Sequence, residues 1–371
     1  MTTSTSSHDE SRAMSRSPKP LTSQEVQRWT RVGTLAAFSL LLSYAETFVP
    51  IPIPGVKLGL ANVAVLAELA CGDATGAACI ALIKVFASGL LFGSPLTMAY
   101  SAMGTALALA GMIPLSRLRT MRLWMVSVVG ALLHEVGQLA VAQLVLRTAA
   151  VWYTLPVLMV AGCVTGALCG WLATGICDAL PTEEEFACSI DSARIESRAP
   201  DARTMTLCAM LVLFCVVVLH AQGLVVLACC AGVALVTCLT TGTRPSAVLR
   251  TALPIASITG MTYVLQLLSG SANAGIEAAR AGLSLASLVW ASRAFAMCIN
   301  PHDLTSTMAW TLQPLTRRGV RTEGFLWAFD VALRLVPTLS TILSDERISP
   351  RELRHQLPTL VRDVCLRAAQ L

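Results

Sequence analysis

Two long stretches of this 371-residue chain contain no charged side chain, and they constrain its fold more than any other feature. Residues 85–116 and residues 205–242 contain no Asp, Glu, Lys or Arg. Crossing the hydrocarbon core of a bilayer takes about 20 apolar residues in a helix, so each stretch is long enough for up to two spans. Outer-membrane β-barrels have short segments of alternating polarity instead. The sequence therefore predicts an all-α, polytopic integral membrane protein.

The overall composition excludes several other classes of protein. Only 13% of the residues are charged, against about a quarter in soluble domains, and the mean hydropathy is +0.67. A disordered chain, a nucleic-acid-binding domain and an ordinary cytosolic enzyme are excluded on this basis. The net charge of +5 comes from basic residues scattered at the ends of apolar segments, so we expect no nucleic-acid partner.

The 13 cysteines do not form a recognisable site. Most of them lie inside apolar runs, no CxxC pair occurs, and no His/Cys cluster has the spacing of metal ligands. Free cysteine usually behaves as a small apolar residue in packed helices. We therefore expect no metal site, and the sequence indicates no cofactor.

The apolar segments predict about ten membrane-spanning helices in two bundles. Six are expected in the first half, at residues 30–49, 57–72, 74–93, 96–115, 123–146 and 150–178. Four are expected in the second half, at residues 205–221, 223–241, 250–269 and 281–299.

Charged segments divide the chain into domains. Residues 1–28 are polar and rich in Ser and Thr, which is typical of a disordered cytosolic leader. We expect a six-helix domain at 29–180, a charged cytosolic linker at 181–203 and a second domain at 204–371. Arg and Lys cluster in alternate loops, which places both termini in the cytosol and the protein in the cell membrane.

The segment at residues 325–343 has two interpretations. By hydropathy it could be an eleventh span, but it contains Asp330 and Arg334, and a charge at a span centre costs about 2.5–3.5 kcal/mol. We favour a cytosolic amphipathic helix in which these two side chains, one turn apart, form an ion pair. Its apolar stripe would consist of Leu326, Phe329, Leu333 and Val336.

The polar residues inside apolar segments are the candidates for chemistry, because such groups are costly in a membrane. Lys57 follows a Pro-Gly turn and Asn62 lies in the next apolar segment. They indicate either a ligand pocket or a lysine that reaches the headgroups and an amide that bonds a neighbouring helix. Lys84, which precedes the first uncharged stretch, is expected at a membrane interface.

A second polar group lies at His134 and Gln138. Four residues apart, they share one face of the predicted helix at 123–146, whereas Glu135 faces elsewhere. They indicate a pocket or an interhelical hydrogen bond. We predict that Lys57, Asn62, His134 and Gln138 approach one cavity of the first bundle and bind a small molecule there.

No catalytic motif is found. The chain lacks the phosphate loop GxxxxGK[ST], the paired-aspartate DDxxD, and the GxSxG and HExxH motifs. We therefore expect that the protein is not an enzyme, and that any ATP hydrolysis is done by partner subunits.

About residues 33–178 resemble the Gx family of small membrane proteins. The stretches that carry the resemblance are PGVKLGLAN at 54–62, LLFGSP at 90–95, AYSAMG at 99–104 and HEVGQ at 134–138. This family is related to the substrate-binding S components of energy-coupling-factor (ECF) transporters, and it has long been labelled heptaprenyl diphosphate synthase component I. The resemblance implies a six-helix bundle that binds a small molecule and topples in the membrane to release it.

The second half, at about 204–371, resembles the transmembrane T component of the same transporters. The similar stretches are WTLQPLTRRG at 310–319 and ALRLVPTL at 332–339, whereas clear copies of the family's two Ala-Arg-Gly-type motifs are absent. We therefore expect a truncated or divergent T-like domain. The resemblance implies coupling to ABC ATPase subunits, through cytosolic basic residues for which we select Arg334, Arg351 and Arg354.

These observations predict a membrane subunit of an ECF-type importer. The alternative is an accessory membrane component of a heptaprenyl or polyprenyl diphosphate synthase, and a membrane scaffold without a ligand is a third possibility.

Overall fold

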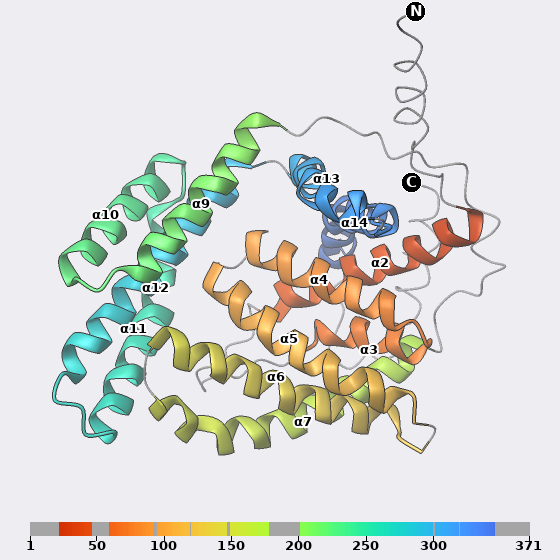
Figure 1. Ribbon diagram of the computed structural model, residues 1–371, viewed down its shortest axis with the longest axis horizontal. Helices are drawn as coiled ribbons and strands as arrows, with labels where there is room; N and C mark the ends of the chain where they lie inside the picture. The colour runs from red at the N-terminus through yellow and green to blue at the C-terminus, as the bar shows by residue number, and fades with distance from the viewer. Residues whose placement is uncertain are drawn as a thin grey trace, which may run out of the picture.

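The fold is described from a computed structural model, which covers residues 22–46, 59–91, 95–118, 120–146, 149–177, 201–299, 301–318 and 320–345. Every regular element in these ranges is helical (Figure 1). The prediction of an all-α fold is therefore confirmed.

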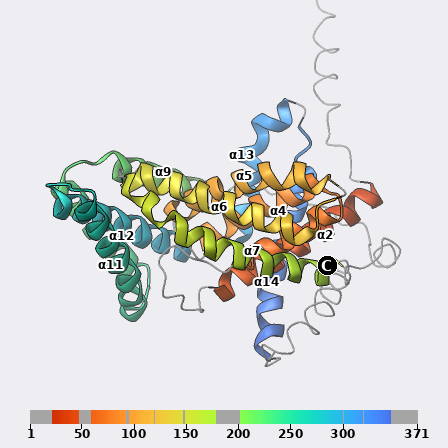
Figure 2. The same ribbon diagram turned by 90° about the horizontal axis from the view of Figure 1, so that it is seen from below.

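The first half forms one group of helices, drawn from red to yellow-green in Figure 1. Its elements are α2 (Ser23–Glu46), α3 (Asn62–Ala70), α4 (Ala74–Leu91), α5 (Pro95–Ser116), α6 (Leu123–Leu146), η1 (Ala149–Thr154) and α7 (Leu155–Cys177). Helices α5, α6 and α7 lie side by side as a layer, and α2, α3 and α4 pack next to them (Figures 1 and 2).

The second half begins with a separate group of four helices on the other side of the molecule (Figure 1). They are α9 (Ala202–His220), α10 (Leu224–Thr240), α11 (Pro245–Leu268) and α12 (Ala274–Cys298). Large apolar side chains such as Met210, Val225 and Leu253 are exposed on the outside of this group. A surface of this kind suits contact with lipid tails, because apolar side chains are unfavourable in water.

Six helical segments of the described residues are long and apolar enough to cross a membrane. They are Thr97–Ser116, Leu123–Val145, Val151–Cys177, Ala202–His220, Pro245–Leu268 and Ala274–Cys298, with shorter apolar helices at Ala74–Gly89 and Leu224–Thr240. The predicted number of ten spans is not confirmed. Helix α3 has 9 residues and a length of about 14 Å, less than half the thickness of the hydrocarbon core.

Helix α2 lies inside the protein. Val32, Leu35 and Leu40 are completely buried, and so are the polar side chains of Thr34 and Ser39. A helix that is buried on all sides needs apolar and small residues all round, which gives it nearly the same composition as a membrane span. Hydropathy therefore predicts a span at residues 30–49; its described part, residues 30–46, is not among the six segments above, and this span stays a prediction.

The chain returns to the first group at its C-terminal end. After α13 (Pro301–Arg317), helix α14 (Glu323–Asp345) packs along α2 (Figure 1), and its C-terminal part extends past the other helices (Figure 2). Ala328, Phe329 and Leu335 of α14 belong to the same hydrophobic cluster as Leu35 and Leu40. The last helix therefore completes the core of the first half, while the domain boundary at 181–203 stays a prediction.

The polar side of α14 agrees with the interpretation of an amphipathic helix. Arg334 Nε lies 2.7 Å from Asp330 Oδ2, as predicted, and the Arg334 side chain is 55% exposed. Of the predicted apolar stripe, Phe329 and Leu333 are buried, whereas the remaining two residues, Leu326 and Val336, are partly exposed. The helix packs against α2 with its apolar side and leaves this ion pair outside.

Glycines allow α6 and α7 to approach closely. A Cβ atom placed at Gly166 would lie 2.8 Å from Val128 Cα, and one placed at Gly170 would collide with the backbone of Trp124. Small residues spaced by four are a common means of close packing between membrane helices.

We expect Gly170→Ala to lower the free energy of unfolding by about 1–3 kcal/mol, because the added methyl group forces α7 away from α6. Gly175→Ala on the same helix is the matched control, since a Cβ atom there meets nothing within 4 Å. SDS titration of the purified protein in mixed micelles would measure both. Equal stability of the two variants would contradict this packing.

Candidate ligand site and ion-pair network

Lys84 of α4 is a buried cation in an apolar bundle. Its side chain is 4% exposed, and its ammonium group donates a hydrogen bond to the Asn62 side-chain oxygen at the start of α3. Lys84 is therefore buried in protein, and its expected place at a membrane interface stays a prediction. Burial of a charged group is costly unless it is hydrogen-bonded, so this pair is the first candidate for a site.

The first turn of α3 is held by several surrounding helices. The Gly59 carbonyl oxygen accepts hydrogen bonds from the backbone N–H of Asn62 (2.8 Å) and from the Cys169 thiol of α7 (3.4 Å). The Glu46 carboxylate of α2 accepts one from the backbone N–H of Leu60. We call Glu46, Gly59, Asn62, Lys84 and Cys169 the Lys84 cluster.

The turn before α3 requires a glycine. Gly59 has a φ of +73°, in the left-handed region that other residues adopt only with strain. It lies in the PGVKLGLAN stretch, as does Asn62, so the structure gives both residues of that motif a local role. Lys57 of the same motif lies outside the described residues.

His134 and Gln138 form a separate pair on α6. The Gln138 amide nitrogen lies 2.9 Å from His134 Nε2, and a Cβ atom placed at Gly104 of α5 would lie 2.8 Å from His134 Nδ1. One placed at Gly137 would lie 2.7 Å from Gly104 Cα. The AYSAMG and HEVGQ stretches therefore meet where α5 and α6 pack together.

The described hydrogen bonds thus group the predicted site residues into two pairs. Asn62 is bonded to Lys84, and His134 is bonded to Gln138. The single cavity for Lys57, Asn62, His134 and Gln138 stays a prediction. Lys84, which was not among the predicted site residues, is the member that the structure adds.

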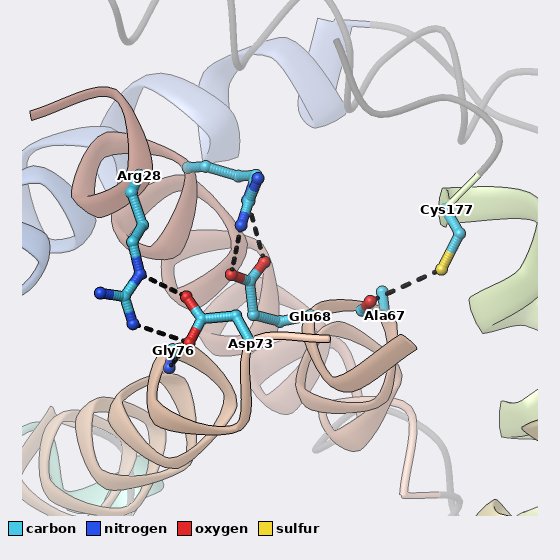
Figure 3. A network of polar contacts seen from close by, with 7 residues as sticks. Arg28, Ala67, Glu68, Asp73, Gly76 and Cys177 are labelled. Atoms are coloured by element: carbon cyan, nitrogen blue, oxygen red, sulfur yellow. Dashed lines mark hydrogen bonds and ion pairs between the residues drawn. The ribbon is translucent and has the colours of Figure 1, made fainter. Parts of the chain in front are cut away.

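Two arginines of α2 form an ion-pair network with carboxylates at the other end of α3 (Figure 3). Arg28 contacts Asp73 through Nε (2.5 Å) and Nη2 (2.7 Å). Arg31 contacts Glu68 through Nε (3.1 Å) and Nη2 (2.8 Å). Both contacts are bidentate, the strongest geometry for a guanidinium and a carboxylate, and the Glu68 side chain is completely buried.

The two carboxylates differ in their acidity. Burial raises the pKa of the Glu68 carboxyl above its usual value, and the Arg31 guanidinium opposes this shift without cancelling it. Burial acts in the same direction on Asp73, but the hydrogen bonds from Arg28 and from the Gly76 backbone N–H outweigh it and lower the pKa of Asp73. The Asp73 carboxylate is therefore the more firmly ionised of the two, and the Arg28–Asp73 pair is fully charged near neutral pH.

The network also connects α2 to the C-terminal helices. Arg321, just before α14, lies 2.8 Å from Glu25 Oε1, and the Trp327 indole N–H donates to Thr30 Oγ1 at 3.0 Å. The first half of α2 is therefore held between the α3–α4 turn and α14. Each charge of this network is already paired within the protein. We therefore interpret the network as a structural clamp and not as a ligand site.

Taken together, the apolar helices and the buried polar pairs define an all-helical membrane protein with a candidate ligand site at the start of α3. Residues 35–176 match the family model described as heptaprenyl diphosphate synthase component I. The match confirms the resemblance predicted for the first half, and it ends before α9. No curated protein and no solved structure matches the chain in the corresponding comparisons. The resemblance of the second half to a T component stays a prediction.

Sequence reasoning missed the partners of the buried charges. Lys84 and Asn62 are 22 positions apart, and Arg31 and Glu68 are 37 positions apart. The available signal was that Arg31, Glu68 and Lys84 all lie within or beside apolar segments, where an ionisable residue needs a partner.

Proposed function

We propose that the chain is a membrane subunit of an ECF-type importer. Its first bundle binds a small molecule beside Lys84, and its second half couples to ABC ATPase subunits supplied in trans. The chain itself is not a catalyst in this proposal. The observation that carries it is the buried Lys84 ammonium group, hydrogen-bonded to Asn62 inside an apolar bundle. Burying an ionisable residue among apolar helices costs free energy, so such a residue is a candidate for function.

The chemistry of the Lys84 cluster favours one kind of ligand. The Lys84 ammonium group and the N-terminal end of α3, with its partial positive charge, attract a carboxylate or phosphate. The Asn62 amide and the Glu46 carboxylate provide further hydrogen-bonding groups, and the surrounding helices provide apolar walls. A small amphipathic metabolite with one anionic group fits this description.

Lys84→Met is expected to weaken binding of such a ligand about 10- to 100-fold, because a hydrogen bond to a charged group is worth about 1.5–3 kcal/mol. The measurement is a thermal-shift screen of the purified protein with carboxylated vitamin-like compounds and isoprenoid phosphates. A ligand at 100 times its Kd stabilises by about 2.7 kcal/mol, so a hit raises the Tm by several degrees in the wild type.

The matched control for this screen is Arg334→Met, which removes a cation from α14 outside the Lys84 cluster and should keep the full shift. An equal shift in Lys84→Met would place the ligand elsewhere. The absence of any hit across both compound classes would count against the proposal as a whole.

The coupling part of the proposal concerns the C-terminal helices. Arg334 is exposed on α14, where a partner can reach it, whereas Arg351 and Arg354 lie outside the described residues. Helix α14 packs on α2, and α2 carries Glu46 of the Lys84 cluster at its end. A partner that moves α14 would therefore act on the ligand site through a single rigid helix.

The description of the matching family favours a second candidate function. An accessory membrane component of a heptaprenyl or polyprenyl diphosphate synthase would raise the rate of prenyl transfer by a catalytic partner. A prenyl-transfer assay with and without this chain separates the two functions, since an importer subunit leaves the rate unchanged.

A further inference from the structure

Two cysteines meet beside the ion-pair network, one at the end of α3 and one at the end of α7. Cys71, the C-cap residue of α3, donates its backbone N–H to the Ala67 carbonyl oxygen (3.1 Å). The Cys177 thiol donates to the same oxygen at 3.6 Å (Figure 3). The Cys177 side chain also lies near enough to lower the pKa of the Cys71 thiol. Two cysteines 106 positions apart in the sequence thus meet at one carbonyl oxygen.

We propose that Cys71 and Cys177 form a reversible disulfide in response to peroxide. The bond would join the α3–α4 turn to the end of α7 and fix two helices that otherwise meet through side-chain packing and hydrogen bonds. Nothing in this inference depends on the identity of a ligand or on the importer function.

The surroundings favour Cys71 as the reacting thiol. Cys71 is exposed, whereas Cys177 is partly buried, so an oxidant in solution reaches Cys71 first. The interaction with the Cys177 side chain lowers the pKa of the Cys71 thiol, burial and the nearby carboxylates oppose this, and Arg31 adds to the lowering. A lowered pKa gives more thiolate, which is the nucleophilic form.

The reaction balances with hydrogen peroxide as oxidant. The Cys71 sulfur attacks one peroxide oxygen and breaks the O–O bond, which gives a sulfenic acid on Cys71 and one water. The Cys177 sulfur then attacks the Cys71 sulfur, forms the S–S bond and breaks the S–O bond, and a second water leaves. The two thiols lose two electrons and the peroxide gains them. A dithiol such as dithiothreitol reverses the step by thiol–disulfide exchange.

The location agrees with a transient bond. Asp73, two residues after Cys71, is bonded to Arg28, so Cys71 and Arg28 lie at the same end of the bundle. This end is the cytosolic side in the topology predicted from the basic loops. Disulfides in the cytosol of mesophiles are usually transient and redox-sensing.

The test uses the full-length protein in detergent, treated with hydrogen peroxide and then blocked with N-ethylmaleimide. We expect mass spectrometry of the tryptic digest to show the Cys71 peptide joined to the Cys177 peptide, and dithiothreitol to remove this product. The bond closes a long loop, so oxidation should also raise the Tm by about 5–10 °C.

Variants make the assignment specific. Cys71→Ser and Cys177→Ser should each abolish the joined peptide and the rise in Tm. Cys163→Ser, which removes an exposed thiol of α7, should keep both. The proposal is overturned if Cys71 is oxidised to a sulfinic acid without joining Cys177, if Cys71 joins another cysteine, or if the wild type shows no joined peptide. The wild-type digest decides the question even where a variant folds poorly.

Discussion

Arg31→Met is expected to lower the free energy of unfolding by about 3–5 kcal/mol, the cost of leaving one partner of a buried ion pair without its counter-charge. Glu68 is completely buried and receives two hydrogen bonds from Arg31. Methionine keeps much of the volume of the arginine stem but provides no donor. SDS titration of the purified protein in mixed micelles measures the change.

The double variant Arg31→Met/Glu68→Met is expected to recover most of that loss, because two apolar side chains can replace a buried ion pair at little cost. Arg334→Met is a matched control on an exposed pair, and it should cost at most about 1 kcal/mol. If Arg31→Met were no more destabilising than Arg334→Met, the buried clamp at the end of α3 would be contradicted.

Gly33→Leu is expected to be the second large effect, at about 3 kcal/mol of lost stability, because it separates α14 from α2. A Cβ atom at Gly33 would lie 2.8 Å from the Ala328 carbonyl oxygen and 2.9 Å from Val331 Cβ. A backbone oxygen cannot move aside like the end of a side chain, so the helices must shift. The same SDS titration measures the loss, and limited proteolysis should show faster cleavage before α14.

Gly232→Leu on α10 is the control for this second variant. Its Cβ position meets nothing within 4 Å, and the residue is exposed, so a leucine there should leave stability within about 0.5 kcal/mol. If the Gly33→Leu variant resisted the protease as well as the wild type does, α14 would not need this contact.

The class of fold could be predicted from the sequence, since uncharged runs of this length suit helices in a membrane and little else. The burial of α2 among the other helices could not. Leu35 and Leu40 are completely buried in protein. Hydropathy measures only how unfavourable water is for a residue, so it does not distinguish a protein interior from lipid. The same limit applies to α3, whose short length follows from the turn at Gly59.

Contacts between distant residues explain the rest of the difference. Trp327 bonds Thr30 across 297 positions, and no local pattern indicates that the last helix packs beside α2. The Asp330–Arg334 pair, by contrast, follows from helical spacing alone and was predicted correctly. His134 and Gln138 were paired for the same reason, whereas the bond between Asn62 and Lys84 depends on how α3 and α4 fold back on each other.

The most direct test of the central claim is to purify the tagged full-length chain from its native membranes in mild detergent and to identify its stoichiometric partners by mass spectrometry. An importer subunit predicts a pair of ABC ATPases that co-purify in fixed ratio and hydrolyse ATP in the complex. A complex with a prenyl diphosphate synthase and without ATPases would contradict the account and support the second function.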